Sequence, residues 1–134
     1  MRFISIAAPL IFLVFAGCAV DPAVQAAHQA KLEEMEKTTP ICNGEKDCAA
    51  KWEMAQFWVS RNSEYKIQTS TNVIIETYSS PDRRIDVRVT KEPMGGGKYK
   101  IVAQVGCNYR INSCMRDELD AILDFNRQVS AATP

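Results

Sequence analysis

The residue types in this chain that could do chemistry are its five cysteines and its single histidine. Hydrolysis by a serine or cysteine nucleophile needs a histidine held beside it in a rigid pocket. The only histidine, His28, lies in a stretch rich in Ala, Gln, Lys and Glu that is typical of a linker. The sequence therefore predicts a non-enzymatic protein with no catalytic residue.

Other motifs that often carry chemistry also have simpler explanations here. Asp117 and Asp120, like Glu33 and Glu34, have the spacing of solvated helix faces rather than of a glycosidase pair. The triplet Gly95-Gly96-Gly97 lies between two strand patterns, whereas a phosphate-binding loop leads from a strand into a helix. Residues 43–47 lack the ligand spacing of a calcium loop. We expect no cofactor and no metal.

Four of the cysteines form two closely spaced pairs. Cys42 and Cys48 have five residues between them, and Cys107 and Cys114 have six. In an exported protein an even number of cysteines predicts disulfides, and four cysteines allow three pairings. The short spacings favour Cys42–Cys48 and Cys107–Cys114. They are wider than the two to four residues typical of structural zinc pairs.

The fifth cysteine, Cys18, ends an N-terminal segment with three zones. Arg2 provides a positive charge, residues 4–15 are apolar, and Ala16 and Gly17 are small. The apolar stretch is shorter than the roughly 20 residues that a transmembrane helix needs. A plain secretory signal with a coincidental cysteine and an uncleaved N-terminal anchor are the alternatives to the interpretation that follows.

The run Phe15-Ala16-Gly17-Cys18 resembles the lipobox of bacterial lipoproteins, although Phe15 replaces the usual Leu, Val or Ile. The resemblance implies that Cys18 is acylated, with lipids such as palmitate, and becomes the first of 117 residues (134 minus 17). Two or more acyl chains anchor a protein stably to a membrane without a transmembrane helix. Ala19, where an Asp would favour inner-membrane retention, implies an outer-membrane location facing the periplasm.

Length and composition predict one small domain. We divide the chain into a signal peptide (1–17), a lipid anchor and tether (18–40), a disulfide-stapled domain (41–130) and a tail (131–134). The 16 basic residues balance 16 acidic ones, so no overall charge favours nucleic-acid binding.

Two helices are predicted in the first half of the chain. Residues 24–37 contain many helix formers after Asp21-Pro22, and Thr38-Thr39-Pro40 stops them. Residues 45–61 form a stronger helix, whose stripe at helical spacing is Cys48, Trp52, Ala55 and Val59. Phe57 and Trp58 widen this apolar surface. We interpret them as core beneath a sheet, with a partner surface as the alternative for either one.

Three strands are predicted next. Residues 65–78 are rich in Thr, Val and Ile, with a bulge around 70–72; residues 84–90 alternate cleanly; and residues 99–107 follow a flexible loop at 93–98. The expected inward residues of the last two strands are Ile85, Val87, Val89, Tyr99, Ile101, Ala103 and Val105. Short connections between successive strands favour an antiparallel meander.

The last predicted element is a helix with Ser113 as N-cap and with Asp117 and Glu118 in its first turns. Its expected buried side is Met115, Leu119, Ile122, Phe125 and Val129. The predicted fold class is therefore α+β: a three-stranded antiparallel meander with two helices on one face, in the order α-β-β-β-α, after the signal and tether.

This arrangement leaves the second face of the sheet open to water. We expect Lys66, Arg84, Arg88, Lys100 and Gln104 on it, with Glu76 and Asp86 between them. Such charges protect sheets against aggregation, and they also suit docking of an acidic partner or an anionic glycan.

Beyond the lipobox, the cysteine-containing segments 41–52 and 107–114 resemble small lipoproteins of Gram-negative bacteria. The layout is similar to envelope assembly lipoproteins, which place both helices before the sheet. The leading hypothesis is a lipoprotein that binds another envelope component, an envelope protein or a glycan. The alternative is a ligand-binding or inhibitor module that uses the loop at 93–98 or the aromatic helix face, and a hydrolytic enzyme ranks third.

Overall fold

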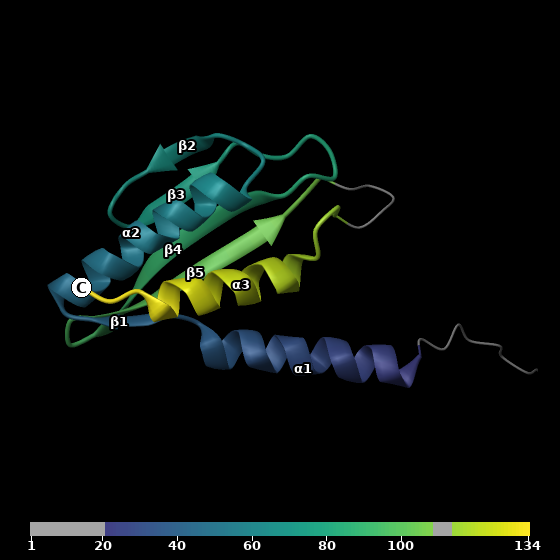
Figure 1. Cartoon of the computed structure of the whole chain (residues 1–134), viewed down its shortest axis with the longest axis horizontal. Coiled ribbons are helices and arrows are strands. Elements are labelled where there is room, and N and C mark those ends of the chain that lie inside the picture. Colours follow the sequence, from purple (N-terminus) through teal and green to yellow (C-terminus); the bar gives the residue numbers. More distant parts are fainter. Residues whose placement is uncertain (1–20, 109–113) are drawn as a thin grey trace, which may run out of the picture.

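The computed structural model describes residues 21–108 and 114–134, which form three helices and a five-stranded antiparallel sheet (Figure 1). The elements are, in order, α1 (Pro22–Thr38), β1 (Ile41–Asn43), α2 (Glu45–Asn62), β2 (Ile67–Ser70), β3 (Ile74–Thr77), β4 (Asp86–Gly95), β5 (Lys98–Gly106) and α3 (Glu118–Ala131). The strand order across the sheet is β1-β5-β4-β3-β2. The predicted α+β class is correct, but the predicted three-stranded meander with two helices is wrong.

One reason is that residues 65–78 form two strands instead of one. β2 and β3 pair antiparallel through a tight turn at Thr71. The Thr71 hydroxyl accepts hydrogen bonds from the backbone N–H groups of Val73 and Ile74, and the Thr71 N–H donates to the Ile74 carbonyl. The side chain of Thr71 thus supplies local partners that reverse the chain, where a bulge was expected.

The other reason why the sheet has more strands than predicted is β1, which follows directly after Pro40. It pairs with the beginning of β5, with Cys42 opposite Tyr99. Cys42 points into the core and is fully buried, whereas Ile41 is exposed. A strand of three residues is too short to show an alternating pattern, so its sequence alone does not distinguish it from a loop.

β4 and β5 form a long hairpin, and their pairing continues through most of the predicted flexible loop. Pro93 lies opposite Tyr99, and Gly95 lies opposite Lys98. Gly95, Gly96 and Gly97 all have positive φ, which lets the turn close tightly. The Gly44 N–H donates to the Gly97 carbonyl, so this turn is tied to the beginning of α2.

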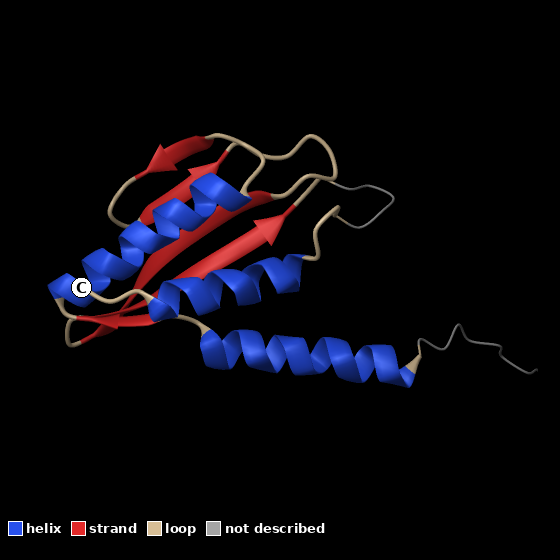
Figure 2. Cartoon of the chain, in the orientation of Figure 1, coloured by secondary structure: helices blue, strands red, loops and turns tan. Residues whose placement is uncertain are grey.

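Helices α2 and α3 cover one face of the sheet (Figure 2). The predicted stripe of α2 is buried, as are Ile85, Val87, Val89, Ile101 and Ala103, while Tyr99 and Val105 are partly buried against the core. Trp58 and Phe125 meet in the core, with ring centroids 5.3 Å apart in an edge-to-face arrangement. These inward residues are predicted correctly because the helical spacing in α2 and the alternation along β4 and β5 each persist over several residues.

Helix α1 begins at Pro22, and the Asp21 carboxylate caps it by accepting a hydrogen bond from the Ala23 N–H, as its sequence predicts. It lies beside α3 and runs in the same direction (Figure 1). Lys31 pairs with Asp120 at 2.6 Å. Among residues 21–108 and 114–134, no helix is both long and apolar enough to span a bilayer.

Helix α3 begins at Glu118, later than expected. The Asp117 carboxylate caps it by accepting a hydrogen bond from the Asp120 N–H. The expected N-cap, Ser113, lies outside the described residues, as does Cys18. Met115, which was expected to be buried, is 70% exposed, so this expectation is wrong. Its N–H donates to the Arg83 carbonyl, and Cys114 is bonded to Cys107, so both contacts hold this segment out of the helix.

Candidate interaction surface

The face of the sheet opposite α2 and α3 carries the outward side chains of all the long strands. Strand register brings them into three rows, each running across neighbouring strands. The rows are Glu76, Arg88 and Gln104; Ile74, Thr90 and Val102; and Glu92, Lys100 and Ile41. The two outer rows therefore carry charges, and the middle row is mostly apolar. The surface offers both charged groups that favour water and apolar area from which water can be removed on binding.

Two of the four predicted basic residues, Arg88 and Lys100, lie on this open face, and so do the predicted Gln104 and Glu76. Arg88 is about half exposed and forms an ion pair with Glu76 at 3.6 Å. Exposed ion pairs of this kind contribute less than about 1 kcal/mol to stability, so Arg88 can exchange Glu76 for another acceptor at little cost. Lys100 is exposed and lies between Glu92 and Ile41 in the strand register.

The other predicted basic residues lie away from these two. Lys66 is exposed immediately before β2. Arg84 precedes β4, where its guanidinium bonds the Asp82 carboxylate at 2.8 Å and lies 5.0 Å from the centroid of the Tyr65 ring. The charge of Arg84 is thus already neutralised within the chain, which makes it a poor candidate for partner binding.

The aromatic pair on α2 divides between core and surface. Trp58 is 1% exposed, which confirms its interpretation as a core residue. Phe57 is 52% exposed and lies beneath the Arg61 guanidinium, 5.5 Å from it, so its interpretation as core is wrong. Phe57 belongs to a helix on the covered side of the sheet, so it does not share a surface with Arg88 and Lys100.

A part-buried hydrogen bond helps to fix the position of Trp58. Its indole N–H donates to the Asp124 carboxylate of α3 at 2.9 Å, and the Arg116 guanidinium lies 3.4 Å from the same oxygen. Burial alone would raise the pKa of Asp124, but the hydrogen bonds from Trp58 and Gln128 and the charge of Arg116 outweigh burial and lower this pKa. This network fastens α2 to α3.

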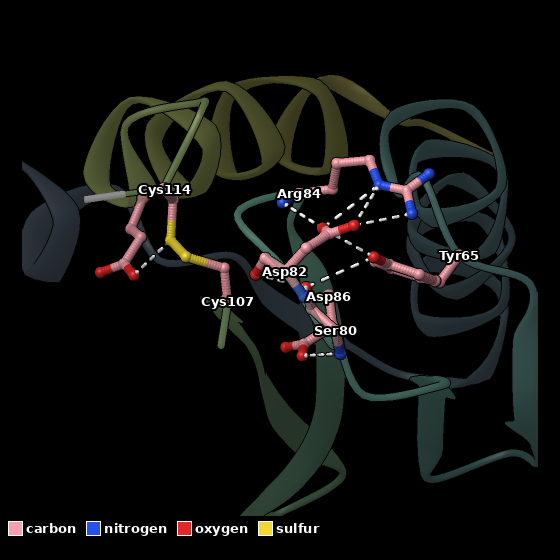
Figure 3. The surroundings of a disulfide bond; sticks show 8 residues. Tyr65, Ser80, Asp82, Arg84, Asp86, Cys107 and Cys114 are labelled. Carbon is pink, nitrogen blue, oxygen red and sulfur yellow. Dashed lines mark hydrogen bonds and ion pairs between the residues drawn. A yellow bond between two sulfur atoms is a disulfide. The ribbon is translucent and has the colours of Figure 1, made fainter. Parts of the chain in front are cut away.

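A second polar cluster lies close to the Cys107–Cys114 disulfide (Figure 3). The Asp82 carboxylate accepts hydrogen bonds from the Arg84 guanidinium, the Arg84 backbone and the Tyr65 hydroxyl, and together they hold the pKa of Asp82 well below its usual range. Ser80 completes the cluster, because its hydroxyl donates to the Asp82 carbonyl at 2.9 Å, and its N–H links the cluster to Asp86 at 2.7 Å. A carboxylate that stays ionised with its acceptor positions filled orders a loop and does not exchange protons near neutral pH.

Both predicted disulfides are present. Cys42 and Cys48 are bonded with a Cα–Cα distance of 4.9 Å, and Cys107 and Cys114 with one of 5.8 Å. The Glu118 carboxylate approaches Cys114 Sγ at 3.0 Å. Since a disulfide sulfur carries no hydrogen, this approach is a sulfur–oxygen contact. Within the described residues, Cys107, Cys114 and Glu118 form the only close group of three or more potential metal ligands, and the disulfide occupies both sulfur atoms.

The sequence interpretation missed one further surface. It is the edge of β5 after Lys100, where pairing with β1 has ended, together with a groove between α1, α3 and β5. No single segment signals this groove, because it depends on where β1 ends and where α1 turns away. His28 lies elsewhere, on the exposed first half of α1.

The chain matches no protein-family model, and no curated protein or solved structure shows significant similarity to it.

Proposed function

We propose that this protein is a membrane-anchored lipoprotein, held through Cys18, whose folded domain binds another cell-envelope component without catalysing a reaction. The observation that carries the proposal is the run Phe15-Ala16-Gly17-Cys18 directly after an apolar stretch. Its resemblance to a lipobox favours acylation, and Ala19, where an Asp would favour inner-membrane retention, favours the outer membrane, facing the periplasm.

The form of the N-terminal helix supports an anchored role. Residues 21–30 are exposed throughout, and the 17-residue helix α1 has a length of about 25 Å. The first described residue, Asp21, is only three positions after Cys18. A lipid at Cys18 would therefore be connected to the folded domain by a helix whose first half extends beyond that domain.

The open sheet face is the proposed contact for an acidic envelope protein or an anionic glycan. Arg88 and Lys100 supply positive charge there, and the row of Ile74, Thr90 and Val102 supplies area that can be desolvated. A mixed surface of this type is typical of transient protein interfaces, whose rims are polar.

Acylation is tested by metabolic labelling with an alkyne-bearing palmitate. The wild-type chain should take up the label and lose residues 1–17, whereas Cys18→Ala should remain unlabelled at precursor size. Ala19→Ser is the control, because it changes the neighbouring residue and leaves the sulfur. Equal labelling and processing of Cys18→Ala and wild type would contradict the anchor.

Partner binding is tested by crosslinking in cells followed by mass spectrometry of the captured material. A recurrent envelope protein should disappear when Arg88 and Lys100 are both replaced by Glu. Replacing Arg61 and Arg127 by Glu is the matched control, because these exposed arginines lie on α2 and α3. Equal capture by both double variants would show that the open face is not the contact.

A further inference from the structure

Among residues 21–108 and 114–134, no strand lies beside the second half of β5 on the side away from β4. β1 covers only Lys98–Lys100, and the Ile101 N–H then donates to the Pro40 carbonyl at 2.8 Å. Before Pro40 the chain belongs to α1, which packs against α3. Residues 102–106 of β5 therefore pair with β4 on one side and with no described strand on the other.

The direction of the free backbone groups follows from Ile101. Because its N–H points toward β1, residues of the same parity in this antiparallel strand present their N–H and C=O groups to the same side. These residues are Ala103 and Val105. They offer the alternating donors and acceptors that another strand would need for pairing.

The composition of this edge favours pairing with another strand. Residues 102–106 are Val-Ala-Gln-Val-Gly, without a charge or a proline. Natural proteins usually protect a free edge with charges, prolines or bulges, or by covering it with a helix or loop. The opposite edge strand, β2, is short and has a register irregularity between Ile67 and Thr69. The β5 edge has no charge, proline or register irregularity over residues 102–106, and α1, the helix nearest to it, leaves a groove beside it.

A groove of about 380 Å³ lies along the same edge, between β5, α1 and α3. Its apolar lining residues are Met35, Val102, Ala103 and Ile122, and its charged ones are Glu36 and Lys100. The apolar part of the lining can take apolar side chains that alternate along one face of an added strand.

We propose that an extended, uncharged peptide segment of a partner protein binds here as an additional strand beside β5. It would bond the backbone of Ala103 and Val105 and place alternate apolar side chains in the groove beside α1. The inference rests on the interaction role proposed above, but it depends neither on Cys18 nor on Arg88 of the open face.

The position of α1 favours a single strand over a second copy of this chain. Two β5 edges paired antiparallel would place the helices of both copies on the same face of one continuous sheet. The α3 helix of the second copy would then cover the strand next to β5, in the space beside α3 where α1 lies (Figure 1). An isolated extended segment meets no such obstacle.

The test uses the full chain in detergent and a synthetic peptide of alternating Val and Thr with Lys at both ends. Peptide binding should slow hydrogen exchange at Ala103 and Val105, measured by mass spectrometry. Gln104→Lys places a charge on this edge and should weaken binding about tenfold. Gln68→Lys, the same change on β2, should leave binding unchanged, as should Arg88→Glu on the open face.

Val105→Pro removes one outward N–H and should weaken binding about fivefold. If this variant does not fold, the comparison of Gln104→Lys with Gln68→Lys decides alone. The proposal is overturned if the peptide does not bind, or if it protects other amides. It is also overturned if the free chain dimerises with Ala103 and Val105 already protected, because the occupant is then a second copy.

Discussion

The two disulfides close loops of almost equal length in very different surroundings. Cys42 and Cys48 are six positions apart, and Cys107 and Cys114 are seven. Loop entropy alone assigns each bond about 2.4 kcal/mol. Cys42 and Cys48 are 0% and 6% exposed and belong to the core, whereas Cys107 and Cys114 are half-buried near the beginning of α3. The comparison separates what a covalent link contributes from what its burial adds.

Other contacts reinforce the contrast between these two regions. The Cys42–Cys48 loop is stabilised from within, because Asp47 accepts hydrogen bonds from the Asn43 N–H at 2.8 Å and from the Lys51 ammonium at 3.1 Å. Near Cys114, the contacts reach distant segments: Met115 bonds Arg83, and Arg116 bonds Asn62. The first region is a local unit packed into the core, and the second joins separate loops and helices.

The largest expected effect comes from removing each disulfide in turn. Cys42→Ala with Cys48→Ala should lower the free energy of unfolding by about 3–4 kcal/mol, since buried sulfur contacts are lost along with the crosslink. Cys107→Ala with Cys114→Ala should cost about 2–3 kcal/mol. Urea denaturation measures both. Equal losses would mean that burial of the first pair adds nothing to the crosslink.

A smaller effect should distinguish the two tryptophans of α2. Trp52 donates its indole N–H to the Thr71 carbonyl in an exposed turn, whereas Trp58 donates to the Asp124 carboxylate between two helices. Trp→Phe removes the same atoms at both sites. The difference between the two losses of stability therefore reports the strength of the hydrogen bond to each acceptor. Trp58→Phe should cost about 1 kcal/mol more than Trp52→Phe, because hydrogen bonds to charged groups are stronger. The opposite order in thermal or urea unfolding would contradict a role for this network in holding α2 to α3.

The smallest expected effect concerns acid. The pKa of Asp82 is lowered chiefly by the Arg84 side chain, and that of Asp47 by the Asn43 N–H and Lys51. A lowered folded-state pKa adds stability above the unfolded value, near 4, and that stability disappears as the pH falls below it. Asp82→Asn and Asp47→Asn should each flatten the decline in unfolding free energy below about pH 5. An unchanged slope in Asp82→Asn would rule out the Asp82 cluster as an acid-sensitive contact.

Sequence patterns predicted the parts of this fold that depend on neighbouring residues. The stripe of α2, the alternation around Val87 and both disulfides are local features, and each follows from spacing alone. The start of α1 at Asp21-Pro22 is predicted for the same reason. Such features survive folding because the chain needs no distant segment to specify them.

Apart from the Thr71 turn, which is local, the missed features depend on segments far apart in the sequence. β1 is a strand only because β5 pairs with it, and Met115 lies outside α3 because Arg83 and Cys107 hold its segment. The Thr71 turn divides an apparently continuous strand through hydrogen bonds of one side chain. The burial of Trp58 is predicted correctly, but its acceptor Asp124, 66 positions away, is not.

The parallel alignment of α1 and α3 determines how the domain responds to mechanical load. Lys31 bonds Asp120, and Asn126 bonds the Met35 carbonyl at 3.1 Å, so their contacts are spread along the common direction of the two helices. A force that pulls Asp21 along the axis of α1 therefore loads these contacts in shear and at the same time. Contacts loaded in this way share the tension, whereas contacts peeled from one end break one after another. The domain should therefore resist a force that pulls α1 along its axis better than a force that peels the same helix away sideways.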